Sequence, residues 1–284
     1  MRLASFSTGF GESFGVVTEN GIVDARKHCN GQAHTLRDAL RQGRLDQLKA
    51  LAKEEADYAR SDVTFLPVIH DPGAKFLCVG VNYLPHIREM GREQPPHPVI
   101  FVRFANSLVG HRQALLKPSA SEEFDFEGEL AVIIGKPAHR VSRDRASEYI
   151  AGYSCFNDGS IREFQWHGPQ WTAGKNFYHS GAFGPWMVTA DEIDDPAKLH
   201  LQTRLNGAVV QTESVGELCF DVAALIEYIS SWAALEPGDV IATGTPGGVG
   251  AGRTPPLWMR DGDLVEVEIS GVGTLQNPVA DEAP

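Results

Sequence analysis

The chain has 284 residues, of which 25 are lysine or arginine and 37 are aspartate or glutamate, so its formal net charge is −12. This acidity argues against a nucleic-acid-binding protein, because phosphate contacts need clustered positive charge. Hydrophobic residues make up 42% of the chain, which is enough for a buried core, yet no stretch has the roughly 18 apolar residues of a membrane span. The opening residues contain no uninterrupted apolar run, so we expect a cytoplasmic protein with no membrane partner.

The first 70 residues have a pattern of their own. Residues 3–6, 13–17 and 22–23 alternate as strands do, and Asn20-Gly21 is a turn signal, which predicts a hairpin. Leucines then recur at helical spacing over residues 35–55, with Thr35 and Asp38 as a cap and its acidic partner. Gly43 is expected to divide this region into two helices, and residues 67–73 form a punctuated linker.

From residue 74 onward the chain is rich in short strands and in turns with glycine and proline. One helix is clear at residues 221–232, where Asp221 is the expected N-cap. Many strands with few helices predict an α+β protein with a mainly β core, in the form of a barrel or a folded sheet. The strands are expected at residues 75–81, 99–104, 129–134, 149–156, 186–189, 199–205, 240–243 and 264–269.

Two glutamates precede a buried apolar run. Because side chains alternate along a strand, Glu127 and Glu129 point to the same side. Two neighbouring carboxylates repel each other, so the pair calls for a proton or a cation, and oxygen ligands favour Mg²⁺, Mn²⁺ or Ca²⁺. The alternative is an exposed face of an edge strand. Asp158 would join the pair if the fold brings it there, although a loop aspartate is also common in turns.

A histidine and a glutamate lie three residues apart at His86 and Glu89. On a helix they would share one face. A carboxylate beside an imidazole orients the ring and raises its basicity, which suits a general base. The alternative is an ordinary surface pair.

The glycine-rich segments exclude several familiar site classes. The segment around Gly174-Lys175 does not have the spacing of a phosphate-binding P-loop. The loop at residues 243–250 follows a strand and could hold a carboxylate in its backbone amides, but it is not a dinucleotide fingerprint. No GxSxG elbow is present to indicate a serine hydrolase.

Together the motifs resemble those of the fumarylacetoacetate hydrolase family. The similarity covers about residues 74–280 and consists of NYxxHxxEM, DFEGELAVIIGK, GYxxxNDxSxRE, WTxGKNF, LEPGDVIATGTPGGVG and GDxVEVEIxGxGTLxN in that order. The resemblance implies the family's mixed β-sheet roll or barrel as a catalytic domain at residues 71–284. It also implies a small N-terminal α/β accessory domain at residues 1–70, and a homodimer.

The resemblance also implies a set of site residues. The metal ligands for Mg²⁺ or Mn²⁺, or Ca²⁺ in some members, would be Glu127, Glu129 and Asp158. The matched motifs further imply a dyad on a lid, formed by His86 and Glu89, a catalytic Lys175, and substrate contacts from Gln165 and Thr245.

Members of the family act on β-keto or acylpyruvate acids. The leading expectation is therefore a metal-dependent hydrolase that cleaves a C–C bond in such an anionic substrate, in catabolism of aromatic compounds or sugar acids. His86 would activate the water, and the metal and Lys175 would stabilise the enolate. The alternatives are a decarboxylase or isomerase of the same family, and a member that binds metal or ligand without catalysis.

Three positions depart from the family's common pattern. Arg103 stands where a lysine is usual, Pro85 replaces an acidic residue, and Tyr178 stands where an aspartate is frequent. We expect Arg103 and Tyr178 to bind the substrate, where they would suit a second carboxylate or an oxygen-rich tail.

Overall fold

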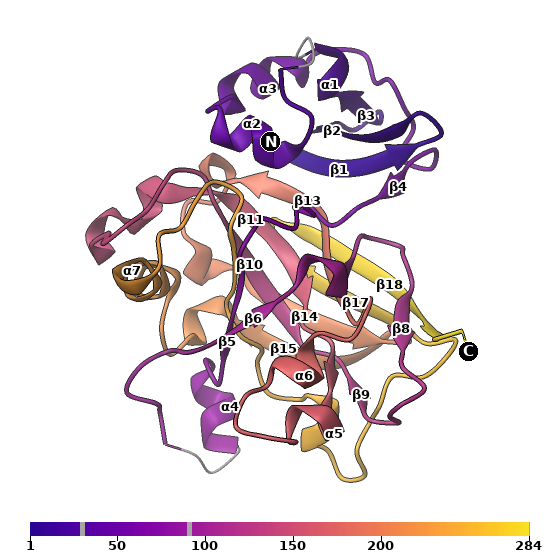
Figure 1. Ribbon diagram of the computed structural model, residues 1–284, viewed down its shortest axis with the longest axis vertical. Helices are drawn as coiled ribbons and strands as arrows, with labels where there is room; N and C mark the ends of the chain where they lie inside the picture. Colours follow the sequence, from indigo (N-terminus) through magenta and orange to yellow (C-terminus); the bar gives the residue numbers. More distant parts are fainter. Residues whose placement is uncertain (29–31, 90–92, 284) are drawn as a thin grey trace.

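The computed structural model describes residues 1–28, 32–89 and 93–283, and in α4 (Leu84–Glu89) it leaves the side chains at 86, 88 and 89 undescribed. Two large sheets, both of them open, form the molecule (Figure 1). The larger has 11 strands, of which nine run in the order β3-β2-β1-β13-β11-β10-β16-β5-β6, while β4 pairs with β1 and β7 with β13. Its strands are β1 (Arg2–Thr8), β2 (Gly11–Val17), β3 (Ile22–Asp24), β4 (Thr64–Phe65), β5 (Phe76–Gly80), β6 (Val99–Arg103), β7 (Leu108–Val109), β10 (Gly128–Ile134), β11 (Ile150–Asn157), β13 (Gly181–Thr189) and β16 (Val240–Ala242).

The second sheet has five strands in the order β15-β14-β17-β18-β8, and a two-stranded pair joins β12 to β9. These strands are β8 (Leu115–Lys117), β9 (Phe124–Asp125), β12 (Ser160–Ile161), β14 (His200–Leu205), β15 (Ala208–Ser214), β17 (Leu264–Ile269) and β18 (Gly273–Asp281). The other helices are α1 (Ala25–His28), α2 (Leu36–Arg41), α3 (Leu45–Leu51), α5 (Arg162–Gln165), α6 (Thr172–Lys175) and α7 (Val222–Trp232), with short 3₁₀ turns η1 (Ala105–Ser107), η2 (Arg143–Tyr149), η3 (Ala190–Glu192), η4 (Pro196–Lys198), η5 (Val215–Glu217) and η6 (Gly250–Gly252).

The expected α+β, mainly β fold is confirmed, and so are several local signals. Asp221 caps α7 by accepting from Ala224 N, and Thr35 and Asp38 form a capping box at α2. Two long strands were not expected, β15 and β18. Both carry polar residues among few apolar ones, and β18 contains Pro278, so neither has the alternation that marks a strand.

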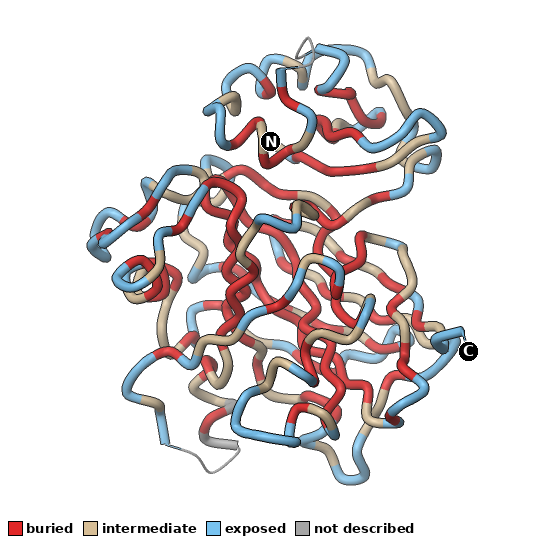
Figure 2. Tube along the Cα trace, viewed as in Figure 1, coloured by how far each residue is buried: buried red, intermediate tan, exposed pale blue. Residues whose placement is uncertain are grey.

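The centre of the large sheet is buried on both faces. Every residue of β10 is buried, and alternate side chains enter different cores: Leu130 and Val132 one, Ala131 and Ile133 the other. Figure 2 shows this as continuous red along the inner strands. Burial on both faces explains why this strand is an unbroken apolar run in the sequence.

The N-terminal strands extend the same sheet. Arg2 and Leu3 of β1 pair with Val188 and Met187 of β13, so residues 1–70 are hydrogen-bonded to the rest of the chain (Figure 1). The expected domain boundary near residue 70 stays a prediction.

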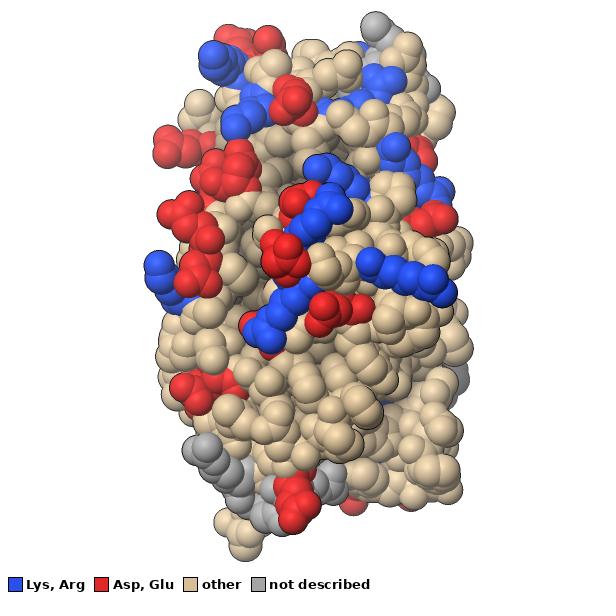
Figure 3. Space-filling view, turned by 90° about the vertical axis from the view of Figure 1, so that its left-hand side faces the viewer, with Lys and Arg blue, Asp and Glu red and all other residues tan. Residues whose placement is uncertain are grey.

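Surface charge does not collect into one patch on the face shown in Figure 3. Acidic and basic side chains intermingle over its upper part, while the lower part is largely uncharged. Within the described residues, no helix is both long and apolar enough to cross a membrane.

Candidate active site

Three buried carboxylates meet where two central strands end. Glu129 lies in β10, Glu127 comes just before it, and Asp158 follows β11; the two strands are antiparallel neighbours with Gly128 opposite Asn157. Each of the three residues offers an oxygen within 4.8 Å of the others. The glutamates are therefore buried in the middle of a sheet, and the alternative of an exposed edge face is wrong.

Three cations surround this carboxylate cluster. Lys175 Nζ lies 2.5 Å from Glu127 Oε2 and 2.6 Å from Asp158 Oδ2. The guanidinium of Arg162 lies 2.6 Å from Glu127 Oε1, and that of Arg103 lies 2.6 Å from Asp158 Oδ1. Burial disfavours the charge of Glu127, but Arg162 and Lys175 outweigh it and hold the pKa of Glu127 below its usual value.

Glu129 has a different environment. Its carboxylate accepts a hydrogen bond from Gly244 N at 2.9 Å, and the described side chains give it no cationic partner. Burial, followed by the charges of Asp158 and Glu127, raises the pKa of Glu129 well above its usual value. A divalent cation would supply the missing positive charge, and three carboxylates are the oxygen donors that Mg²⁺ and Mn²⁺ prefer. The donor set therefore fits the expected metal.

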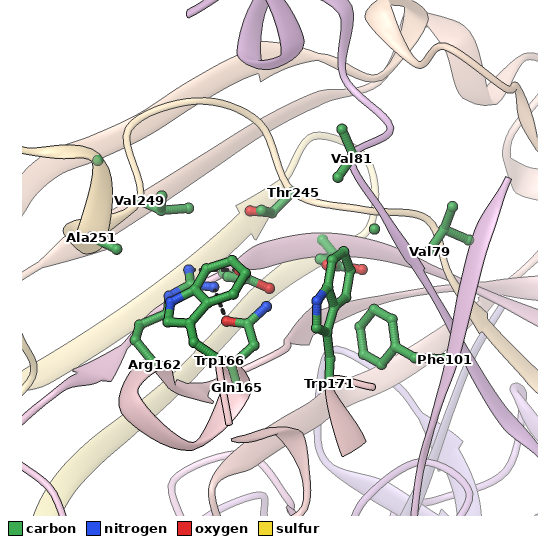
Figure 4. A pocket seen from close by; sticks show the side chains of 14 residues that line it. Val79, Val81, Phe101, Arg162, Gln165, Trp166, Trp171, Thr245, Val249 and Ala251 are labelled. Carbon is green, nitrogen blue, oxygen red and sulfur yellow. Dashed lines mark hydrogen bonds and ion pairs between the residues drawn. The ribbon is translucent and has the colours of Figure 1, made fainter. Parts of the chain in front are cut away.

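The carboxylate cluster opens onto a cavity of about 390 Å³ (Figure 4). Gln165 and Thr245 line it, as their expected roles require. Gln165 accepts from Arg162 through Oε1, which leaves its Nε2 free to donate to a ligand. Thr245 donates its proton to the Gly128 carbonyl and accepts from Gln211, so in this arrangement its hydroxyl proton points away from a ligand.

Arg103 is not placed as expected. Its side chain is fully buried, four of its five N–H groups donate to Asp158, the Gly159 carbonyl, Ser107 and Ser180, and it is not among the described residues that line the cavity. The direct substrate contact is corrected to a role in holding Asp158.

Tyr178 is likewise displaced from the expected role. It is 57% exposed, stacks on His179 with ring centroids 3.7 Å apart, and does not line the cavity. The side chains of His86 and Glu89 lie outside the described residues, so their expected dyad stays a prediction. The backbone places both residues on α4, next to Asn82, whose side chain donates to the Phe220 and Thr243 carbonyls.

Two buried residues of the site were missed from the sequence. Arg162 joins Glu127 to Asp125, and Asp125 also accepts from Gly250 N and Ala251 N, which ties the glycine-rich loop to the carboxylate cluster. Both residues lie inside the quoted DFEGE and NDxSxRE motifs. Asp125 is flanked there by Phe124 and Phe126, and a charged residue between two apolar ones is a usable signal for a buried ion pair.

Comparisons with known proteins agree with this geometry. Residues 75–280 match the sequence model of the fumarylacetoacetate (FAA) hydrolase C-terminal domain. A mitochondrial oxaloacetate tautomerase of Homo sapiens is 37% identical over 98% of this chain and 91% of its own. A fumarylacetoacetate hydrolase structure from Exiguobacterium antarcticum has a TM-score of 0.87 at 33% identity, covering 99% of this chain and 100% of its own.

A second solved relative carries a metal. Maleylpyruvate hydrolase from Sphingobium sp. SYK-6, solved in complex with manganese(II) and pyruvate, has a TM-score of 0.82 at 28% identity and covers all of both chains. The match of the family model over most of the chain, together with full-length relatives above 30% identity, establishes that the chain belongs to the fumarylacetoacetate hydrolase family.

Proposed function

We propose that the chain is a Mg²⁺- or Mn²⁺-dependent hydrolase that cleaves a C–C bond in acylpyruvates or related β-diketo acids. The observation that carries this proposal is the buried carboxylate cluster, in which one acid has no cationic partner among the described side chains and which opens onto a ligand-sized cavity. The reaction class is taken from the family's hydrolases, among them the maleylpyruvate enzyme whose structure contains manganese and pyruvate.

Glu127, Glu129 and Asp158 would hold the metal. When bound, the ion supplies a Lewis acid that stabilises the enolate of a 2-oxo acid. Lys175 stays protonated beside Glu127 and Asp158, because their charges outweigh the burial that would lower its pKa. Its ammonium group therefore adds fixed positive charge beside the reacting oxygen atoms.

Hydrolysis also needs an activated water. We assign that step to His86, oriented by Glu89 on α4 (Leu84–Glu89). The imidazole takes a proton from water, the oxygen bonds to the acyl carbonyl carbon, and the C–C bond to the neighbouring CH₂ breaks. The electron pair passes to the 2-oxo fragment, which takes up a proton to become pyruvate.

A second activity is keto–enol tautomerisation of a β-keto acid. It is favoured by the tautomerase relative, which matches 98% of this chain. Tautomerisation moves a proton at the carbon between the carbonyl groups and needs no water. The same carboxylate cluster and Lys175 serve both reactions.

The test is an activity screen of the purified protein with Mg²⁺ or Mn²⁺ and with EDTA. Hydrolysis of acetylpyruvate is followed by loss of enol absorbance and by pyruvate release, and tautomerisation by the enol absorbance of oxaloacetate. We expect metal-dependent pyruvate release that His86→Ala abolishes. Tautomerisation without pyruvate release would replace hydrolysis with the second activity, and absence of both would favour a binding protein.

We also propose that the protein is a homodimer. The edge strand β6 and the following residue expose Val99, Val102 and Phe104, and Tyr178 is exposed close in sequence to Asn176, which bonds Phe104 N and the Val102 carbonyl. Exposed apolar side chains on an edge strand are typical of an interface. Phe104→Glu should shift the mass in light scattering from dimer to monomer, and an unchanged mass would exclude this surface.

A further inference from the structure

The cavity next to the carboxylate cluster has two chemically different ends. One end holds Glu127 and Glu129 with Arg162 and Gln165. The remaining described lining is mostly apolar. Val79, Val81, Phe101 and Trp171 lie together on one side in Figure 4, Trp166 and Val249 lie nearer Arg162, and Thr245 is polar. A 2-oxo acid bound with its oxygens at the carboxylate end would therefore extend its other end along this apolar wall.

The cations of the described site are all engaged. Arg162, the one cationic residue among those described as lining the cavity, uses its guanidinium on Asp125, Glu127 and Gln165. Lys175 is bonded to two metal-ligand candidates, and Arg103 is not among the described residues that line the cavity. A second carboxylate on the apolar wall would lose water without gaining a partner from these groups, which is strongly unfavourable.

The aromatic side chains of the cavity are held in place by specific packing contacts. The rings of Phe101 and Trp171 meet edge to face, with centroids 5.4 Å apart. The indole of Trp171 lies directly against Gly80 of β5: a Cβ atom there would be 2.1 Å from Cζ3 and 2.6 Å from Cη2. Any side chain at position 80 would push the indole out of its place, so Gly80 fixes this wall. Trp166 also lines the cavity and is 55% exposed.

We infer that the site selects 2-oxo acids whose distal group is uncharged and flat, an aryl or alkenyl group, over those that end in a second carboxylate. Trp171, seated on Gly80, is the specificity-determining residue, and Phe101 completes the surface on which the distal group packs. The inference rests on the proposed function, since it assigns the oxygen-rich end of the substrate to the carboxylate cluster.

The test compares three probes on the enzyme loaded with Mg²⁺: benzoylpyruvate with an aryl tail, acetylpyruvate with a methyl tail, and fumarylpyruvate with a terminal carboxylate. We expect kcat/KM for benzoylpyruvate to exceed that for fumarylpyruvate at least tenfold. Trp171→Ala should lower the benzoylpyruvate value at least tenfold and the acetylpyruvate value less than threefold. A preference for fumarylpyruvate, or equal losses for both tails in Trp171→Ala, would overturn the inference.

Matched variants separate this effect from general damage. Gly80→Ala should reproduce the loss for the aryl probe, whereas Gly9→Ala, where an added Cβ meets nothing within 4 Å, should not. Trp232→Ala removes a tryptophan on α7 that is 55% exposed and does not line the cavity, and it should leave all three probes unchanged. If Gly80→Ala does not fold, Trp171→Leu carries the same comparison.

Binding distinguishes failure of this inference from failure of the proposed function. Tryptophan fluorescence gives the affinities of phenylpyruvate and 2-oxoglutarate in the presence of Mg²⁺, whether or not either is turned over. Tighter binding of phenylpyruvate with no turnover of any probe would support the tail preference and reject the hydrolase. Tighter binding of 2-oxoglutarate would reject the tail preference even if hydrolysis is observed.

Discussion

Two groups of charged side chains in this protein, each with buried members, differ in their charge balance. The first joins α2 to the start of β5 and β16, and we call it the Arg37 cluster: Arg37, Asp71, Lys75 and Asp239. Two cations face two acids there. The remaining donors of Arg37 reach the Pro237 and Gly73 carbonyls, and Asp239 also accepts from the Lys75 and Glu236 amides, so every group has a partner.

The carboxylate cluster and its neighbours are not balanced in this way. Among the described side chains, four acids face three cations, which leaves one negative charge over, and that charge lies next to a cavity. The acids are Asp125, Glu127, Glu129 and Asp158, and the cations are Arg103, Arg162 and Lys175. The comparison teaches that buried charge alone does not mark a functional site. A surplus of charge of one sign beside a cavity does mark a functional site, because a ligand of the opposite charge can neutralise it.

The largest expected effect is the loss of activity when the surplus charge is removed. Glu129→Gln keeps an acceptor for Gly244 N but removes one carboxylate, so we expect kcat/KM to fall by about 1,000-fold or more. The metal-free variant should be as stable as the wild type or more stable, because a buried charge without a cationic partner is gone. Steady-state kinetics and urea unfolding in EDTA measure the two quantities. Retained activity, or clear destabilisation in EDTA, would contradict the contrast between the clusters.

The Arg37 cluster should respond in the opposite sense. Arg37→Met leaves Asp239 buried with one cation fewer, so we expect the free energy of unfolding to fall by about 3–5 kcal/mol. The kcat/KM of the folded enzyme should stay within about threefold. Arg41→Met is the matched control on the same helix: its ion pair with Glu236 is half exposed and should contribute less than about 1 kcal/mol. A loss of activity at constant stability in Arg37→Met would refute a purely structural role.

Arg103→Met tests the corrected position of that residue. Because Arg103 holds Asp158, we expect metal affinity to fall by about 10- to 100-fold. The KM values of substrates with one and with two carboxylates should change by the same factor. Metal titration and kinetics with acetylpyruvate and fumarylpyruvate measure these quantities. A rise in KM confined to the diacid would show that Arg103 binds the substrate directly.

The smallest effect concerns the acid sensitivity of the Arg37 cluster. Burial disfavours the charge of Asp71, but Gly73 N and Arg37 outweigh it and lower the pKa of Asp71 in the folded protein. The unfolded chain therefore binds the proton first as pH falls, and the contribution of Asp71 is present above about pH 4 and lost below it. Since Asp71 is partly exposed, we expect the difference in unfolding free energy between wild type and Asp71→Asn to shrink measurably, by up to about 1 kcal/mol, between pH 6 and pH 3. A difference that stays constant over this range would show that Asp71 is not stabilised by its partners.

The carboxylate cluster shows which site residues can be predicted from the sequence and which contacts cannot. Glu127 and Glu129 were found because a period of two beside an apolar run is a local signal. The partner of Arg103 could not be found in this way, since Asp158 is 55 positions away and the guanidinium reaches it only after β6, β11 and the turn between β11 and β12 have packed. The contact between Trp171 and Gly80 could not be predicted either, because the two residues are far apart in the sequence.

Strands, too, could be predicted only where the sequence carries a local side-chain pattern. Strands with a continuous apolar run or clear alternation, such as β10 and β17, were found close to their observed bounds. β15 and β18 pair with β14, β17 and β8 through backbone hydrogen bonds, and no side-chain pattern in the sequence predicts these pairings.

The most direct test of the central claim is calorimetric titration of the metal-free protein with Mn²⁺. We expect one ion to bind per chain in the wild type and in Arg37→Met with affinities within about threefold of each other, and binding at least about 100-fold weaker in Glu129→Gln. Equal Mn²⁺ affinity in the wild type and Glu129→Gln would contradict the assignment of the carboxylate cluster as the metal site.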